Sequence, residues 1–186
     1  MPDKKELRKE IKTILRGITD KEFNDAGKKI FARILSDDCY KRAKNVFCFV
    51  SMKSEPQIID FLKKVLADGK GLYLPKVTEN GMIAVKTENL DLIQGAYGIY
   101  EPRGTADTEK AIDLAVIPCL AMSVNGSRLG HGGGYYDRFL QNFGGDTVAV
   151  CMERFVFPKL PTEAHDMEIS KIATEDKIID TKKSVL

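Results

Sequence analysis

The sequence lacks any pair of cysteines placed to chelate a metal. Its four cysteines, Cys39, Cys48, Cys119 and Cys151, form no CxxC motif and show no zinc-ligand spacing. Cys48 and Cys151 lie inside apolar runs, where cysteine usually packs as a small hydrophobic side chain. We therefore expect free thiols in a reducing compartment, rather than a zinc site.

Long hydrophobic runs and an excess of one charge are also missing. No apolar stretch approaches the roughly 20 residues that span a bilayer, and the start, MPDKKELRKE, has no apolar signal region. The 29 Lys and Arg residues nearly balance 27 Asp and Glu residues, leaving a net charge of +2. This balance does not favour nucleic-acid or membrane binding, although a local cluster can still bind a small anion. We expect a cytoplasmic protein and a monomer.

No repeat, low-complexity segment or linker divides the 186 residues, so one domain spanning 1–186 is expected. Apolar periodicity predicts helices over 2–18, 19–35, 57–70 and about 134–142. Asp3 is a plausible N-cap of the first, and Thr19 with Glu22 has the pattern of a capping box. Apolar runs predict strands over 45–50, 112–118 and 147–151, and an antiparallel pair over 71–77 and 82–87.

The alternation of helices and buried strands predicts an α/β fold. We expect a single-domain, layered, Rossmann-like structure with a mainly parallel central sheet flanked by helices. In such sheets, ligands bind at the carboxyl ends of the strands. The loops that follow Val50 and Pro118 would meet at that edge if their strands share the sheet.

The stretch RLGHGGGYYDRFL, which starts at Arg128, places four glycines among five residues directly before a predicted helix. A tight turn that needs positive φ angles would explain them. The alternative is a phosphate-binding loop, because bare N–H groups at a helix start attract anions. We favour phosphate binding because Arg128 and Arg138 flank the glycines. The loop has neither the Gly-Lys-Ser/Thr ending of a Walker motif nor the GxGxxG spacing of dinucleotide-binding proteins.

The stretch NGSRLGHGGGYYDRFL resembles the signature of the 5-formyltetrahydrofolate cyclo-ligase family. The likeness extends, in order and spacing, to four further elements: FVSMKSEP, GIYEP, DLAVIPCLAMS and PTEAHDMEI. Lys4 and Arg8 match a basic pattern in the family's first helix. One departure is that Met122 and Ser123 stand where family members often carry Phe-Asp, which weakens any role for an acid there.

The resemblance implies conversion of the reduced folate 5-formyltetrahydrofolate to 5,10-methenyltetrahydrofolate, with ATP and Mg²⁺ as co-substrate and cofactor. Phosphoryl transfer depends chiefly on positioning and charge neutralisation. On a helical wheel, Lys4 falls within the apolar arc of the first helix and Arg8 at its edge. Snorkelling along the core would explain one such cation, whereas two suggest that the helix borders a polar cleft.

The resemblance also implies site residues. Arg128 and Tyr136 are the expected catalytic residues, and Val50, Glu55 and Tyr136 the expected substrate-binding residues. Asp137 and Asp166 are expected at the metal, although Asp137 could instead orient Arg128 or act as a favourable first-turn acid. The expected ATP-binding set is Lys4, Lys5, Arg8, Arg128, Leu129, Gly130, His131, Gly132, Gly133, Gly134, Tyr135 and Asp137.

Two of these residues also have plain structural explanations. Glu55 could be an exposed loop acid, and Tyr136 could simply pack on a helix face. Two other functions stay open: a nucleotide- or folate-binding protein without catalysis, and a dinucleotide-dependent oxidoreductase, which the glycine spacing disfavours.

Overall fold

The computed structural model describes residues 3–95, 98–104, 112–163 and 165–182. Within these ranges a seven-stranded sheet has the order β12-β11-β9-β6-β1-β2-β3. Its strands are β1 (Asn45–Cys48), β2 (Gly71–Thr78), β3 (Gly81–Thr87), β6 (Leu114–Pro118), β9 (Asp146–Val150), β11 (Lys171–Ala173) and β12 (Ile178–Asp180). The pairs β2–β1, β1–β6, β6–β9 and β9–β11 are parallel, and both edge strands are antiparallel. The predicted α/β fold with a mainly parallel central sheet is confirmed.

The helices begin close to the residues that the caps predict. They are α1 (Lys4–Leu15), α2 (Asp20–Ser36), α3 (Asp38–Arg42), α4 (Ile59–Ala67), α5 (Tyr135–Leu140) and a short 3-10 helix, η3 (Glu153–Phe155). Asp3 caps α1 and Thr19 caps α2, each within a capping box. The predicted helix start at residue 2 lies outside the described residues. Helix α4 is shorter than predicted, and α5 ends at Leu140 rather than near 142.

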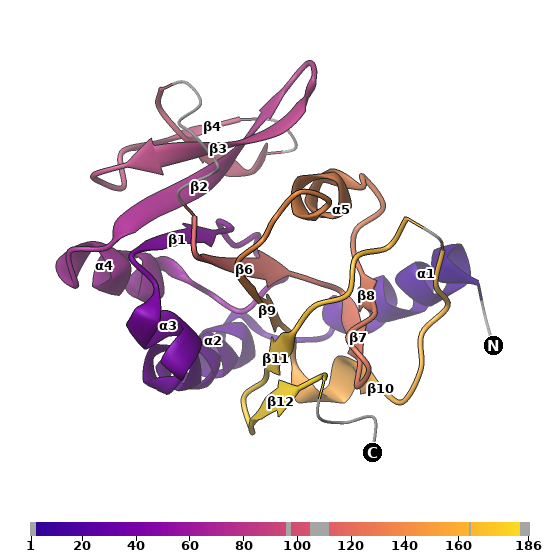
Figure 1. Cartoon of the computed structure of the whole chain (residues 1–186). Coiled ribbons are helices and arrows are strands. Elements are labelled where there is room, and N and C mark those ends of the chain that lie inside the picture. Colours follow the sequence, from indigo (N-terminus) through magenta and orange to yellow (C-terminus); the bar gives the residue numbers. More distant parts are fainter. Residues whose placement is uncertain (1–2, 96–97, 105–111, 164, 183–186) are drawn as a thin grey trace.

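The helices cover the two faces of the sheet unequally. In Figure 1, α2, α3 and α4 gather on one side of the central sheet, and α5 lies on the other. Phe61 of α4 stacks on Phe31 of α2, whereas Phe47 of β1 stacks on Phe139 of α5 with ring centroids 4.4 Å apart. Because α5 is anchored on β1, the glycine loop before it is held above the carboxyl ends of the central strands.

Two segments outside the predicted helices and strands contain short strands. The expected loop after Pro118 includes β7 (Ala121–Ser123) and β8 (Arg128–Leu129), an antiparallel pair that also contacts β10 (Val156–Phe157). The buried residues Ala121, Met122 and Leu129 explain this pairing, since each strand is too short to show a periodicity by itself. Further along the chain, β4 (Leu92–Gln94) pairs with β5 (Tyr100–Pro102). Residues 96–97 and 105–111 lie outside the described residues.

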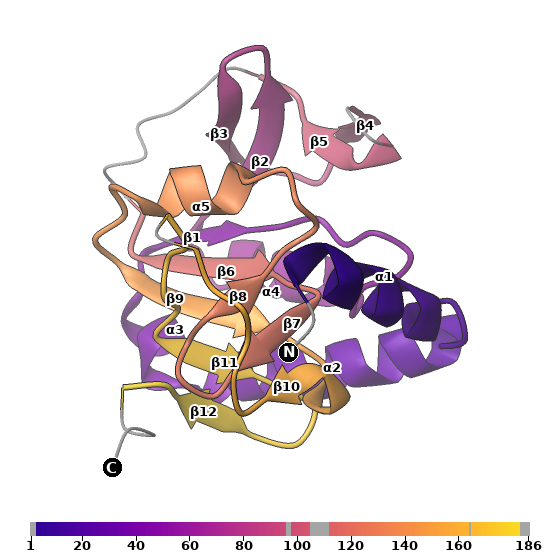
Figure 2. The ribbon, with the colours of Figure 1, turned by 90° about the vertical axis from the view of Figure 1, so that its right-hand side faces the viewer.

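Helix α1 lies beside β7 and β8, as Figures 1 and 2 both show. In Figure 2, the hairpins β2–β3 and β4–β5 rise above α5. Of the helices that the structure describes, none has the length and apolar character to cross a membrane.

Candidate active site

One large cavity lies at the carboxyl ends of β1 and β6, where the α/β pattern predicts a ligand site. Its volume is about 560 Å³. Segments from the whole chain line it: α1, the loop after β1, the β2–β3 hairpin, β5, the glycine loop with α5, and a C-terminal segment that comprises Glu163, His165 and Asp166. The lining residues include Lys4, Arg8, Val50, Glu55, Arg128, Gly130, His131, Gly132, Gly133, Gly134, Tyr135, Tyr136, Asp137 and Asp166. Most of the predicted site residues therefore share one cavity.

Two predicted residues do not line this cavity. Lys5 is exposed on α1, and the side chain of Leu129 is buried in the core. Leu129 belongs to strand β8, which leads directly into the glycine loop.

The glycine loop has two left-handed backbone positions, and at one of them the backbone is open. Gly132 and Gly134 have φ angles of 108° and 65°, in the left-handed region that favours glycine. A Cβ atom added to Gly132 would meet only the Arg8 guanidinium, 3.7 Å away. Arg8 Nε donates a hydrogen bond of 2.9 Å to Gly130 O. At Gly132, turn geometry and an open backbone thus occur together, and the open side of the backbone faces the Arg8 guanidinium.

Arg128 is held beneath the loop with its side chain only 3% exposed. Its Nη2 donates to Asp137 Oδ1 at 2.9 Å, its Nη1 donates to Pro118 O at 3.2 Å, and its guanidinium lies 5.5 Å from the centre of the Tyr136 ring. The buried Nε has no hydrogen-bond partner among the described residues. A buried donor without an acceptor is costly, so the site fits an anionic ligand.

Lys4 is a buried cation on the inward side of α1, as the helical wheel predicts. It is 9% exposed, and its Nζ lies 2.6 Å from Asp166 Oδ2 and 2.9 Å from Glu163 Oε2. Burial acts to raise the pKa of Asp166, but hydrogen bonds from Lys4 and from the Glu163 N–H outweigh it and lower that pKa. These bonds join the first helix to the C-terminal segment at the edge of the cavity.

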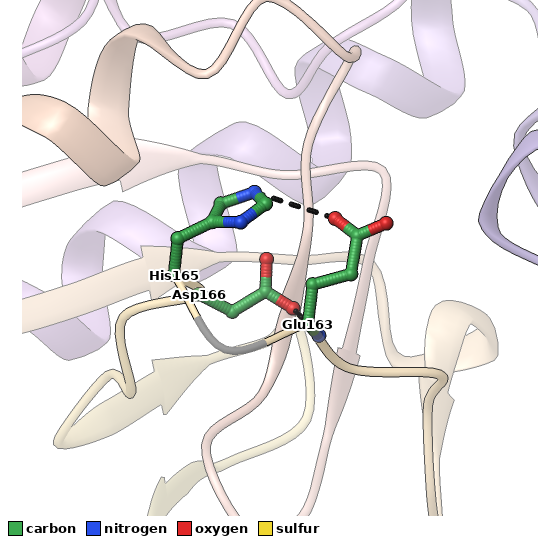
Figure 3. Close-up of side chains that lie close together, drawn as sticks. All are labelled: Glu163, His165 and Asp166. Atoms are coloured by element: carbon green, nitrogen blue, oxygen red, sulfur yellow. Dashed lines mark hydrogen bonds and ion pairs between the residues drawn. The ribbon is translucent and has the colours of Figure 1, made fainter.

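Glu163, His165 and Asp166 form a cluster that could hold a metal ion. One ligand atom from each lies within 4.8 Å of the others, and His165 Nε2 faces Glu163 Oε2 at 3.3 Å, as Figure 3 shows. Carboxylate oxygens suit Mg²⁺. Because Lys4 contacts the same oxygens, a cation would compete with it for Asp166. Sequence reasoning named Asp166 but missed Glu163, three residues earlier in the PTEAHDMEI element.

Glu55 is buried, so it is not the exposed loop acid that the sequence left open. It is 4% exposed; its Oε2 accepts a 2.8 Å hydrogen bond from Met52 N, and its Oε1 lies 3.2 Å from His131 Nε2. Burial, and after it the charge of Glu55, raises the pKa of the nearby Tyr136. The hydroxyl of Tyr136 therefore stays neutral. Tyr136 packs against Phe47 and also lines the cavity, so packing does not remove it from reach of a ligand.

The sequence did not reveal the opposite wall of the cavity. Pro75 and Val77 of β2, Met82 of β3, and Ile99 make it apolar, and Glu101 of β5 adds a buried carboxyl group. The GIYEP element was the available signal for Ile99 and Glu101, but it pointed to no ligand role. The wall suits a flat, largely apolar group.

Comparisons with known proteins agree with one another. The sequence profile of the 5-formyltetrahydrofolate cyclo-ligase family matches residues 1–175. The 5-formyltetrahydrofolate cyclo-ligase of Mus musculus is 27% identical over 190 residues, covering 93% of this chain and 94% of the mouse protein. The enzyme of the same name from Saccharomyces cerevisiae is 25% identical, with 95% and 97% covered.

A solved structure has the same fold over nearly the whole chain. The NMR structure of Aquifex aeolicus 5,10-methenyltetrahydrofolate synthetase superposes with a TM-score of 0.87 at 30% identity, covering 96% of this chain and 93% of that one. The Mycoplasma pneumoniae synthetase, at 19% identity, shares the fold with a TM-score of 0.77 and coverage of 94% and 99%.

Proposed function

The chain belongs to the 5-formyltetrahydrofolate cyclo-ligase family, and we propose that its large cavity converts 5-formyltetrahydrofolate to 5,10-methenyltetrahydrofolate with consumption of ATP. One observation carries the assignment to this cavity. A glycine loop with cations beside it, which suits phosphate, and an apolar wall with buried carboxyl groups, which suits a folate ring, border the same space.

The reaction requires activation of a poor electrophile. Transfer of the γ-phosphoryl group of ATP to the formyl oxygen makes that oxygen part of a good leaving group and produces ADP. The N10 amine then attacks the formyl carbon, loses its proton, and expels phosphate to give the methenyl product. Positioning the two substrates and neutralising charge are therefore the main tasks of the protein.

The phosphate end is assigned to the glycine loop and the cations around it. Arg8 lies beside Gly130 and Gly132, and Lys4 lines the same cavity. Backbone N–H groups of Gly130, Gly132, Gly133 and Gly134 provide donors on residues that carry no side chain. Arg128 lines the cavity, its buried Nε has no partner among the described residues, and Asp137 holds the guanidinium in place. Lys5 is exposed and takes no part at this end, and Leu129 only packs in the core.

The chain also supplies oxygen ligands for Mg²⁺. Asp166 and Glu163 would hold the ion, and Asp137 is a further candidate, although its Oδ1 already binds Arg128. When bound beside ATP, Mg²⁺ neutralises phosphate charge. Binding at Asp166 would release Lys4 from its ion pair and free its ammonium for a phosphate oxygen.

The folate end comprises Val50, Glu55, Tyr136 and the apolar wall. One chain supplies both ends, which supports a monomer that acts as a single domain. The four free cysteines support a reducing, cytoplasmic compartment.

The test is to mix the purified chain with 5-formyltetrahydrofolate and MgATP and to follow the absorbance of 5,10-methenyltetrahydrofolate. We expect product only when ATP is present, with one ADP formed per product. Binding of both ligands without product would indicate a non-catalytic binding protein. A requirement for a nicotinamide cofactor would indicate an oxidoreductase instead.

A further inference from the structure

Glu101 is a buried charged residue that the proposed chemistry does not use. It lies on β5, is 6% exposed, and lines the cavity. Its Oε1 accepts a hydrogen bond of 3.1 Å from Val77 N. A carboxylate removed from water needs several donors, because each of its oxygens can accept more than one hydrogen bond.

The neighbours of Glu101 in the cavity are apolar. Pro75, Val77 and Met82 of the β2–β3 hairpin and Ile99 just before β5 line the same wall. An aromatic ring can pack its face on such a surface while its edge reaches the carboxyl group. The ligand that fits this wall therefore has a flat ring with hydrogen-bond donors on one edge.

We propose that Glu101 recognises the pyrimidine edge of the pterin ring, accepting hydrogen bonds from the ring N3–H and the 2-amino group. This inference rests on the proposed folate substrate and assigns the orientation of its ring. Two adjacent, parallel donors match the two oxygens of a carboxylate or the two lone pairs of one of those oxygens, and a charged acceptor makes such bonds strong.

The backbone around Glu101 fixes the position of its carboxyl group. A Cβ atom added to Gly95 would lie 2.2 Å from Glu101 Oε2, so only glycine leaves room for the carboxyl group there. Gly95 N donates to Ile99 O at 2.8 Å and closes the segment between β4 and β5. The carboxyl group thus lies beside Gly95 and is oriented by the Val77 N–H before a ligand arrives, which favours selective binding.

Glu55, the other buried glutamate of the cavity, is less suited to this role. Met52 N and His131 already engage its two oxygens, and His131 belongs to the glycine loop at the phosphate end. Glu55 therefore lies near the reacting end of the folate, and Glu101 lies at the ring end.

The test compares two substrates, 5-formyltetrahydrofolate and its 2-desamino-2-methyl analogue, which keeps N5, N10 and the formyl group. For the unmodified protein, we expect kcat/KM to fall about 10- to 100-fold with the analogue, as loss of a charge-assisted hydrogen bond implies. Glu101→Gln can still accept the Val77 N–H but directs an amide donor at the ring edge. This variant should process the two substrates almost equally well, with an unchanged KM for ATP.

Glu175→Gln is the matched control. Glu175 also accepts a backbone hydrogen bond, from Glu153 N at 2.8 Å, and it does not line the cavity. Its substitution should leave the discrimination intact. Glu101→Asp, which keeps the charge but shortens the reach, should give intermediate discrimination and serves if the Gln variant folds poorly.

Three results would overturn the assignment. The unmodified protein could fail to discriminate between the two substrates, Glu101→Gln could retain the full discrimination, or Glu55→Gln could abolish it instead. Failure of the proposed function itself looks different, because then the unmodified protein forms no methenyl product from 5-formyltetrahydrofolate.

Discussion

The ion pair between Lys4 and Asp166 should contribute both to stability and to ATP binding. Substitution Lys4→Met keeps an unbranched side chain with good helix propensity but removes the ammonium group that contacts Asp166 at 2.6 Å. Among the described residues, Asp166 then keeps one donor, Glu163 N at 2.7 Å. An unpaired buried charge costs ~3–5 kcal/mol. Because the pair borders an open cavity, we expect a smaller loss of about 2–3 kcal/mol, at or just below the lower end of that range.

Thermal and urea unfolding measure this loss. For a chain of this size, the melting temperature should fall by about 4–12 °C. In a double-mutant cycle that combines Lys4→Met with Asp166→Asn, the two losses of stability should be strongly non-additive, because the two side chains interact directly. Lys5→Met, one residue along the same helix but exposed, should change stability by less than ~0.5 kcal/mol. Additive losses in the cycle, or equal losses at Lys4 and Lys5, would refute the role of the ion pair.

The same variants separate a structural cation from a phosphate-binding one. Lys4→Met combined with Arg8→Met should raise the KM for ATP strongly, measured by steady-state kinetics on folded protein, whereas Lys5→Met should not. Removal of residues 1–9 should act like the double variant. If the folded double variant keeps the KM of the unmodified protein, α1 does not contribute to the ATP site.

Three further substitutions address the glycine loop, the buried arginine and the ion pair between Asp37 and Lys171 of β11. Gly132→Ala places a side chain at φ 108°, so it should reduce turnover and cost about 1 kcal/mol of stability. Gly144→Ala, with open space around it, should do neither. Normal turnover of Gly132→Ala would contradict the phosphate-loop assignment. Arg128→Ala should weaken ATP binding more than folate binding in calorimetric titrations, and equal losses would argue against a phosphate contact. Burial acts to raise the pKa of Asp37, but hydrogen bonds from Cys39 and Lys171 outweigh it and lower the pKa. The stability that this shift provides is therefore full above the unfolded-state pKa of ~3.9 and is lost as the pH falls through the lower folded-state value. Lys171→Met should flatten this acid dependence in urea titrations, and an unchanged dependence would exclude the pair as its source.

Local signals predicted the parts of the site that lie within one segment of chain. Asp3 and Thr19 marked helix starts because a capping hydrogen bond spans only a few residues. The glycine loop was recognisable because its residues are consecutive. The inward position of Lys4 followed from the helical period, since an amphipathic helix must turn its apolar side to the core.

Features that depend on distant contacts escaped prediction. Glu163 contacts Lys4, which is 159 residues away in sequence. The apolar wall forms because the β2–β3 hairpin lies across the cavity from the glycine loop. The periodicity of a single segment cannot predict that these two segments face one another. Lys5 shares the basic pattern of α1 but faces away, so charge alone was a poor guide to its position.

The most direct test of the account follows the formyl oxygen. The central claim is that this oxygen receives the phosphoryl group of ATP and leaves as part of phosphate. The purified chain is incubated with MgATP and 5-formyltetrahydrofolate that carries a heavy oxygen isotope in the formyl group, and the phosphate released is analysed by mass spectrometry. The account predicts one labelled oxygen in each phosphate formed with product. Methenyl product accompanied by unlabelled phosphate, with the label in water, would contradict it.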